Sequence, residues 1–411
     1  MNDISGDVIR DALSGNPQRG LALLERARSL KAEMGAWRRE IHRHPELGFE
    51  EHRTAQLVAN ALGDMGLEVR PGVARTGVVG RLGQGRPAVG IRADMDALRL
   101  EEETQGPYVS TVPGKMHACG HDAHVAIVLG VAKLLSEMDH VLSGEIRFLF
   151  QPSEERWDEE GNSGGKLMVA EGALDGLDAV LALHVDSEMP TGMAEVRSGY
   201  AEAAVDSFEA TITGAGCHGA YPHTGVDPIF ILAQVINAVH GIRARRIDPT
   251  EPAVISIGTV HAGQANNVIP HAVEITGTIR SCDNEIRQQL REELERAIAV
   301  ACALGGDYEL AISEGYPMTY NDPEVAEVVR QTAEDLLGPE ALHPAKPIMG
   351  AEDFSYMARE VPGAMFTLGA RIGDRPRPHH SPSFDIDESS LPIGAALLAE
   401  TVFRLLTDRS H

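Results

Sequence analysis

The spacing of apolar residues predicts alternating helices and strands over the first half of the chain. Apolar positions three and four residues apart indicate amphipathic helices, and short apolar runs rich in β-branched residues indicate strands. We expect helices over 21–42, 55–65, 123–138 and 166–173, and strands over 78–82, 88–94, 145–150 and 178–184. This alternation is typical of an α/β sheet flanked by helices, where chemistry gathers at the strand ends.

From about residue 195 the pattern changes to the two-residue alternation of half-buried strands, and after about residue 313 the first pattern returns. In the middle part we expect strands over 205–213, 253–260 and 273–280 and helices over 227–242 and 284–303; after it, a helix over 323–337, a strand over 364–369 and a helix over 391–406. The predicted fold class is therefore α/β with a mixed sheet. Its larger domain comprises 1–194 and 313–411, and a smaller α+β domain over 195–312 interrupts it.

Composition narrows the possible partners. The 411 residues are 43% hydrophobic, enough for a sizeable core, and 36 basic against 61 acidic residues give a net charge of −25. That charge argues against nucleic acid or a membrane as partner and favours small molecules or a second copy of the chain. The N-terminus lacks the pattern of a signal peptide, and four cysteines suit a reducing compartment, so we expect a cytoplasmic location.

A dense group of metal-binding residue types lies between Met116 and His124, which reads Met-His-Ala-Cys-Gly-His-Asp-Ala-His. Imidazole, thiolate and carboxylate are the ligands that Zn²⁺ and similar ions accept, and Cys119 and His121 flank a glycine that lets both face one ion. The alternative is that these histidines cap the following helix or lie buried in the core.

Further candidates follow the predicted strands. Glu154 and Glu155 come after the strand 145–150, where adjacent side chains point apart, so one carboxylate can bind metal while the other acts as a base. A solvated surface pair is the alternative reading. His184 ends the strand 178–184 and can equally be a buried structural histidine, and the pair 379–380 can be an incidental loop feature.

The order of these motifs resembles the hippurate hydrolase-like amidohydrolases, which include indole-acetyl-amino acid hydrolases and belong with the aminoacylase and carboxypeptidase metallopeptidases. The resemblance covers nearly the whole chain. It rests on the stretches HRHPELGFEE (42–51), RADMDAL (92–98), MHACGHDAH (116–124), QPSEE (151–155), LHV (183–185), NVIP (267–270), GTIR (277–280), MGAEDF (349–354) and HSPSF (380–384).

The resemblance implies a catalytic domain that binds two divalent metal ions. Cys119 would bridge the ions, and the remaining ligands would be His121, Glu155, His184 and His380. Glu154 would be the general base that takes a proton from the attacking water, and Asp96 would orient a ligand imidazole. Asp94 stands where the relatives have a histidine ligand. Zinc, manganese, cobalt and nickel all suit such ligands.

The resemblance also gives the inserted domain a role as lid and dimerisation domain. His218 would reach into the site of a second subunit and, with Asn267, stabilise the oxyanion. Arg280 would clamp the substrate carboxylate beside the backbone of Gly350, although a surface position on a strand is an equal alternative for this arginine. The expected assembly is a homodimer or a homotetramer.

The expected activity is metal-dependent hydrolysis of the amide bond of N-acyl amino acids. A dipeptidase or carboxypeptidase with the same machinery is the alternative within enzymes, and a protein with a closed structural zinc site is the alternative outside them. Two departures from the family concern specificity: Arg99 replaces the usual proline, and the stretch 156–163 lengthens the segment after the glutamates. We hypothesise that this stretch shapes acyl-group selection, although a surface insertion without function explains it as well.

Overall fold

The computed structural model describes residues 18–138, 142–346, 348–375 and 377–408, so the N-terminal stretch in which we find no signal peptide lies outside it. The chain divides into two compact units. The larger unit is Met1–Gly199, Tyr320–Ala345 and Tyr356–His411; the smaller is Tyr200–Thr319 with Lys346–Ser355. The segment Lys346–Ser355, which contains Gly350, therefore groups with the smaller unit, whereas the sequence reading assigned it to the larger domain.

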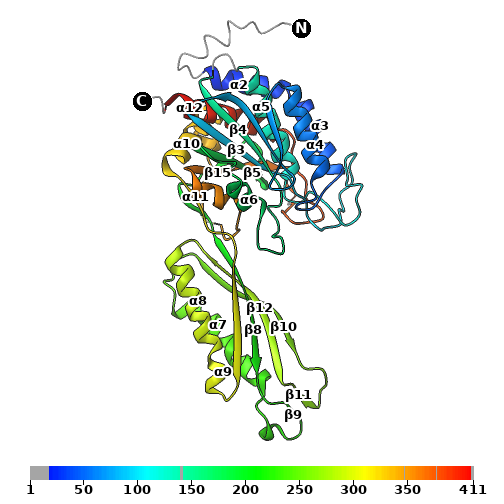
Figure 1. The fold of residues 1–411 in the computed structure, drawn as a ribbon, viewed down its shortest axis with the longest axis vertical. Helices are drawn as coiled ribbons and strands as arrows, with labels where there is room; N and C mark the ends of the chain where they lie inside the picture. Colours follow the sequence, from blue (N-terminus) through cyan, green and yellow to red (C-terminus); the bar gives the residue numbers. More distant parts are fainter. Residues whose placement is uncertain (1–17, 139–141, 347, 376, 409–411) are drawn as a thin grey trace. The chain divides into compact units, whose positions relative to one another are not determined.

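A seven-stranded mixed sheet forms the centre of the larger unit, as predicted (Figure 1). Its order is β1 (Glu68–Val73), β2 (Gly77–Gln84), β4 (Gly144–Gln151), β3 (Ala88–Asp94), β5 (Ala179–Pro190), β15 (Gly363–Arg371) and β6 (Ala194–Glu195). The four strands from β4 to β15 run parallel, and the flanking strands are antiparallel. The carboxyl ends of the parallel strands thus meet at one edge of the sheet, where the predicted site residues are expected.

Helices cover this sheet. They are α2 (Gln18–Ser29), α3 (Lys31–Arg43), α4 (His52–Asp64), α5 (His121–Ser136), α6 (Gly164–Ala170), α10 (Pro323–Leu337) and α12 (Ser390–Asp408), with α11 (Phe354–Glu360) and the short η3 (Pro339–Ala341). Nearly every residue of α5 is buried, because it lies between the central strands and α12. The stretch Ser390–Thr407 of α12 is long and apolar enough to cross a membrane, but it is 83% buried, as expected of a core helix.

Three details of the larger unit do not follow from the sequence pattern. The predicted helix over 21–42 is two helices that meet at Leu30. This leucine is itself buried, so the apolar pattern continues across the break and does not reveal it. The predicted strands β2 and β3 are not neighbours, because β4 lies between them, and the edge strand β1, with Pro71 and Gly72 in it, gave no strand pattern.

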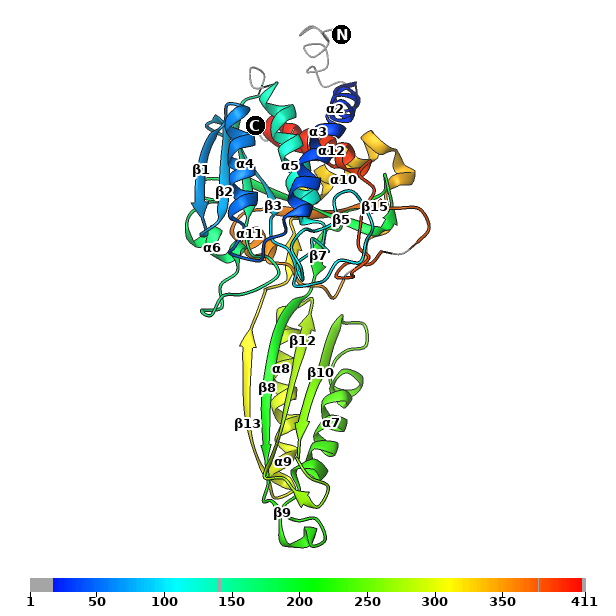
Figure 2. The same cartoon turned by 90° about the vertical axis from the view of Figure 1, so that its right-hand side faces the viewer.

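The smaller unit is a four-stranded antiparallel sheet with helices against it (Figure 2). The strand order is β10 (Ala253–Ala262), β12 (Ala272–Ser281), β8 (Ala204–Thr213) and β13 (Asp307–Glu314); the helices are α7 (Pro228–Arg245), α8 (Asn284–Ile298) and α9 (Val300–Ala303). Short elements are β7 (Gly199–Glu202), β9 (Cys217–His218), η2 (Pro222–Thr224), β11 (Val268–Ile269) and β14 (Thr319–Asn321). The predicted helix 284–303 is divided at Ala299 into α8 and α9, and β13 is an addition to the predicted strands.

A buried charged network fixes the first turn of α5. Arg38 Nε donates to Asp122 Oδ2 at 3.1 Å, and His42 Nδ1 lies 2.8 Å from the same oxygen. Burial lowers the pKa of His42, but Asp122 and Glu102 outweigh burial and raise it to about 9. His42 is therefore a cation held between two carboxylates, and it ties α3 to the start of the helix that carries His121.

Candidate metal centre

The candidate residues meet at the carboxyl edge of the parallel strands. Asp94 is the last residue of β3, and the register pairs Arg92 with Ala182 of β5, so His184 is level with the end of β3. The strand β5 continues to Pro190, so His184 lies inside the strand and not at its end, as the sequence suggested. His184 thus reaches the site because its neighbouring strand ends there.

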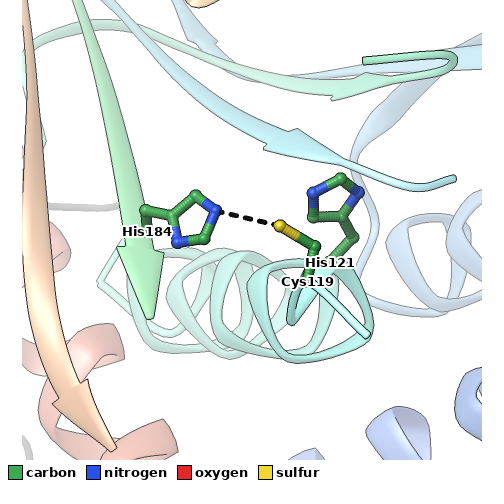
Figure 3. A group of neighbouring side chains, drawn as sticks. All are labelled: Cys119, His121 and His184. Carbon is green, nitrogen blue, oxygen red and sulfur yellow. Dashed lines mark hydrogen bonds between the residues drawn. The ribbon is translucent and has the colours of Figure 1, made fainter. Parts of the chain in front are cut away.

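Cys119 and His121 flank a glycine turn at the start of α5. Gly120 has φ 95°, and a Cβ there would lie 2.4 Å from a methyl carbon of Val185, so only glycine fits. The helix begins at His121, two residues earlier than predicted. Cys119 Sγ lies 3.5 Å from His184 Nε2, with His121 beside it (Figure 3).

The donor atoms form two groups of three that share the Cys119 thiol. One group is Cys119, His121 and His184, and the other is Cys119, Glu155 and His380; within each, the donor atoms lie within 4.8 Å of one another. His380 Nε2 is 3.0 Å from Glu155 Oε1, and the His380 N–H donates to the carbonyl of Ala118 at 2.8 Å, next to the thiol. A thiol common to two groups suits a bridging ligand.

Hydrogen bonds to backbone carbonyls orient two of the imidazoles. His184 Nδ1 lies 2.8 Å from the Val185 carbonyl, and His121 Nδ1 lies 2.9 Å from the Asp96 carbonyl. Donation through Nδ1 leaves the Nε2 lone pair of each ring for a metal ion. Within the described part of the chain, Nε2 of His121 has no hydrogen-bond partner.

The carboxylates around His121 and Cys119 favour bound cations at this site. Burial lowers the pKa of His121, but the carboxylates of Asp94 and Asp96 outweigh burial and raise it to about 10. Burial and the neighbouring glutamates raise the pKa of the Cys119 thiol well above its usual range. The His121 shift and part of the Cys119 shift reflect excess negative charge, so the donor set holds protons that divalent ions would replace. The residues therefore fit a pair of divalent ions.

Asp96 contacts both His121 and the backbone of the two glutamates. Its oxygen Oδ1 accepts the N–H of Glu154 at 3.1 Å, and Oδ2 accepts the N–H of Glu155 at 3.0 Å. Oδ1 is also 3.3 Å from His121 Nδ1. The side chains of Glu154 and Glu155 belong with His121 to a third group of neighbouring donors.

The remaining histidines of the cluster 116–124 are buried and neutral. His124 Nδ1 lies 2.6 Å from Asp94 Oδ1, and its Nε2 accepts the N–H of Val185 at 3.0 Å, so both ring nitrogens are occupied. The other oxygen of Asp94 accepts from Arg92 at 2.8 Å. His117 is buried, and burial lowers its pKa to about 4, so its ring is neutral.

One histidine of the loop before α12 has a role that the sequence reading missed. His379 packs between His184 and Phe384 with its ring tilted to both, and the ring centroids are 5.2 Å and 5.0 Å away. Burial lowers its pKa, so the ring stays neutral. The adjacent histidines thus have different contacts: His380 faces Glu155, and His379 packs against the His184 ring. Their adjacency in the sequence gave no sign of which one faces inward.

The other predicted site residues lie in the smaller unit. His218 and Asn267 come together on the ribbon of β9 and β11, where the Gly219 N–H donates to the Asn267 carbonyl at 2.7 Å. The Ala220 N–H donates to His218 Nδ1 at 3.0 Å, which places the proton of this exposed ring on Nε2. Arg280 lies on β12, and the Gly350 carbonyl accepts from the Ala203 N–H at 2.9 Å.

The sequence of this chain is similar to those of known proteins of one family. The sequence model of peptidase family M20/M25/M40 matches residues 90–404. Thermostable carboxypeptidase 1 of Saccharolobus solfataricus is 41% identical, over 92% of this chain and 98% of its own length. N-acetyl-L-cysteine deacetylase of Bacillus subtilis is 37% identical, over 92% and 89%.

A solved structure shows the same fold. The Bacillus subtilis YXEP protein, described as a dinuclear metal-binding peptidase of the M20 family, has a TM-score of 0.80 and 31% identity, over 92% of this chain and 99% of its own. This similarity confirms the resemblance inferred from the motifs, and it supports two metal ions in the donor set around Cys119. The chain therefore belongs to peptidase family M20/M25/M40 and is a metal-dependent amidohydrolase that uses two divalent ions.

Proposed function

We propose that this enzyme hydrolyses the amide bond of N-acyl amino acids to a carboxylate and a free amino acid. The observation that carries the proposal is the arrangement of the two glutamates. Glu155 faces His380 at 3.0 Å, in a group that shares the thiol, whereas Glu154 lies near His121 and Glu155 but belongs to neither of the groups that contain the thiol. One carboxylate is thus a ligand, and its neighbour is a base beside the ions.

The chain's own residues account for the proton transfers. Two bound divalent ions would supply Lewis acidity toward the scissile carbonyl and toward water. Glu154 takes a proton from the attacking water and delivers it to the nitrogen of the leaving amino acid as the C–N bond breaks. The His218 Nε2–H, fixed by the Ala220 hydrogen bond, donates with Asn267 to the oxyanion that forms. The products are a carboxylic acid and an amine, and no redox step occurs.

Arg280 supports a substrate with a free carboxylate. This guanidinium is partly buried, and its pKa is lowered by burial alone, with no carboxylate among the described residues to oppose the shift. A desolvated arginine without an anionic partner is a suitable clamp for a planar carboxylate. The similarity to N-acetyl-L-cysteine deacetylase favours an N-acyl amino acid over a longer peptide.

A substrate panel tests this proposal. We expect N-acetyl and N-benzoyl amino acids to have a higher kcat/KM than dipeptides or N-blocked peptides. Replacing the free carboxylate with a carboxamide should lower kcat/KM by about 100-fold, because the arginine then faces a neutral group. A preference for peptides would instead favour the carboxypeptidase alternative. If the enzyme hydrolyses none of these compounds, the proposed substrate class is wrong.

We propose that His218 acts across a homodimer. Its exposed ring belongs to the smaller unit, which also exposes apolar side chains on α7 and on the edge strand β10: Ile229, Phe230 and Val260 are 43%, 58% and 46% exposed. Exposed apolar side chains and an unpaired strand edge in the same unit favour association with a second copy. Each active site would then combine the metal ligands of one subunit with the His218 of the other.

Mixing two inactive variants tests the composite site. His218→Ala and Glu154→Gln subunits are each expected to be nearly inactive, whereas their exchanged mixture should recover about a quarter of wild-type activity, since half of the dimers hold one intact site. The assay is hydrolysis after subunit exchange is shown by a labelled partner. His223→Ala, a change at a neighbouring exposed histidine, is the control and should stay active alone. No recovery under complete exchange would contradict the proposal.

A further inference from the structure

The turn that carries the two glutamates has an unusual backbone. Ser153, the residue before Glu154, has φ 46°, in the left-handed region that side chains other than glycine avoid. Ser153 is fully buried, and its hydroxyl donates to the carbonyl of Arg156 at 3.0 Å. Such a conformation persists only when surrounding contacts hold it, and residues of this kind gather at active sites.

Two buried carboxyl groups hold this turn by accepting three successive backbone N–H groups. Asp96 accepts from Glu154 and Glu155 at 3.1 and 3.0 Å, and Glu51 Oε1 accepts from Ser153 at 2.8 Å. Asp96 also contacts His121, so it belongs to the site directly. Glu51, in contrast, belongs to none of the donor groups of the site, and it contacts the turn at the residue where the backbone is left-handed.

A glutamate at position 51 lowers the free energy of unfolding, so its presence points to a function. It is fully buried, and its other oxygen accepts the Thr76 hydroxyl at 2.5 Å. Burial and the charge of Asp96 raise the pKa of its carboxyl, and no arginine or lysine among the described residues pairs with it. A buried carboxyl without a cation destabilises a fold compared with an apolar side chain of similar size.

The segment that carries Glu51 packs directly on the turn. A Cβ added at Gly48 would lie 2.3 Å from Ser153 Oγ, so the Gly48 backbone lies directly against the Ser153 side chain. The Glu46 carbonyl accepts the N–H of Ala97 at 2.8 Å, next to Asp96. Glu51 and Asp96 are thus parts of one rigid support behind the two glutamates.

We propose that Glu51 is a positioning residue, which holds the Ser153 amide so that Glu154 and Glu155 point to their separate tasks of base and metal ligand. The inference rests on the proposed function for the role of Glu154. Glu51 itself touches neither substrate nor ion; it acts through the backbone of the turn.

Two substitutions of similar volume separate this role from a merely structural one. Glu51→Gln keeps an oxygen that accepts from Ser153, whereas Glu51→Met fills the space without an acceptor. We expect Glu51→Met to lower kcat by about 10- to 100-fold, with KM within about twofold, and to weaken the binding of one ion by a similar factor. Glu51→Gln should stay within about threefold of wild type in kcat and in metal affinity.

The measurements are steady-state kinetics, titration of the metal-free protein with Zn²⁺, and amide hydrogen exchange of the peptide that contains Ser153. Exchange of that amide should become faster in Glu51→Met and stay slow in Glu51→Gln. Thr76→Val is the matched control, because it removes the other hydrogen bond of Glu51 and leaves the Ser153 bond in place. We expect this control to keep wild-type kcat.

Wild-type kcat and metal affinity in Glu51→Met would overturn the proposal, as would equal losses in the methionine and glutamine variants. If Glu51→Met does not fold, Glu51→Asp replaces it, since a side chain one methylene shorter withdraws the acceptor from Ser153; wild-type behaviour of that variant overturns the proposal equally. Full activity of Glu154→Gln would instead refute the proposed base. In that case the Zn²⁺ titration would still test Glu51, because the turn that Glu51 holds also carries Glu155, the proposed metal ligand.

Discussion

Replacing Glu154 with glutamine is expected to lower kcat for N-acyl amino acid hydrolysis by about 10²- to 10⁴-fold, the usual contribution of general acid–base catalysis. Glutamine has nearly the same volume and cannot accept the proton from water. Because the Asp96 carboxylate holds the Glu154 N–H and not its side chain, the turn should keep its shape. The metal content, measured by elemental analysis of the purified variant, should stay at two ions per chain.

The neighbouring glutamates provide matched controls for this variant. Glu155→Gln should also lose activity, but through lost metal, because Glu155 shares a donor group with Cys119 and His380. Glu160→Gln, at a side chain that is 75% exposed in the following loop, should change neither quantity. A Glu154→Gln enzyme with wild-type kcat would remove Glu154 from the mechanism, and one that lost its ions would make it a ligand.

Much of the fold could be predicted from local pattern. The bounds of β3 (Ala88–Asp94) and α10 (Pro323–Leu337) agree with the prediction, because a continuous apolar run or a regular helical period ends there at a clear turn signal. The order of the strands could not be predicted in this way. The insertion of β4 between β2 and β3 depends on contacts between residues far apart in the chain, which a periodic pattern does not contain.

The candidate site, like the fold, could be predicted from the sequence only in part. Motif order and the resemblance brought Cys119, His184 and His380 together from three segments, and the structure places these side chains as neighbours. The sequence could not show why His124 is excluded, because that follows from a backbone N–H of Val185 that occupies its second nitrogen. Nor could it single out Glu51, since only the folded chain brings this carboxyl to the Ser153 amide.

Cys119→Ala is expected to weaken both metal sites at once. The thiol belongs to the group of His121 and His184 and also to that of Glu155 and His380, so its removal takes one donor from each. We expect the metal content to fall from two ions per chain to below one. We also expect kcat to fall by about 10³-fold, the effect of losing several kcal/mol of Lewis-acid stabilisation of the transition state.

Substitutions of residues that belong to only one of the two donor groups test whether the thiol is shared. His184→Gln and His380→Gln should each weaken one ion and leave the other, whereas Cys302→Ala, at an exposed cysteine of the smaller unit, should bind both. Because an apolar, acidic surrounding keeps the Cys119 thiol protonated in the metal-free protein, wild type and Cys119→Ala should unfold at similar temperatures without metal. Adding Zn²⁺ should then raise Tm much more in the wild type than in the variant, since an ion stabilises the state that binds it. Two ions bound with unchanged affinity in Cys119→Ala would show instead that the ions occupy separate sites without a common ligand.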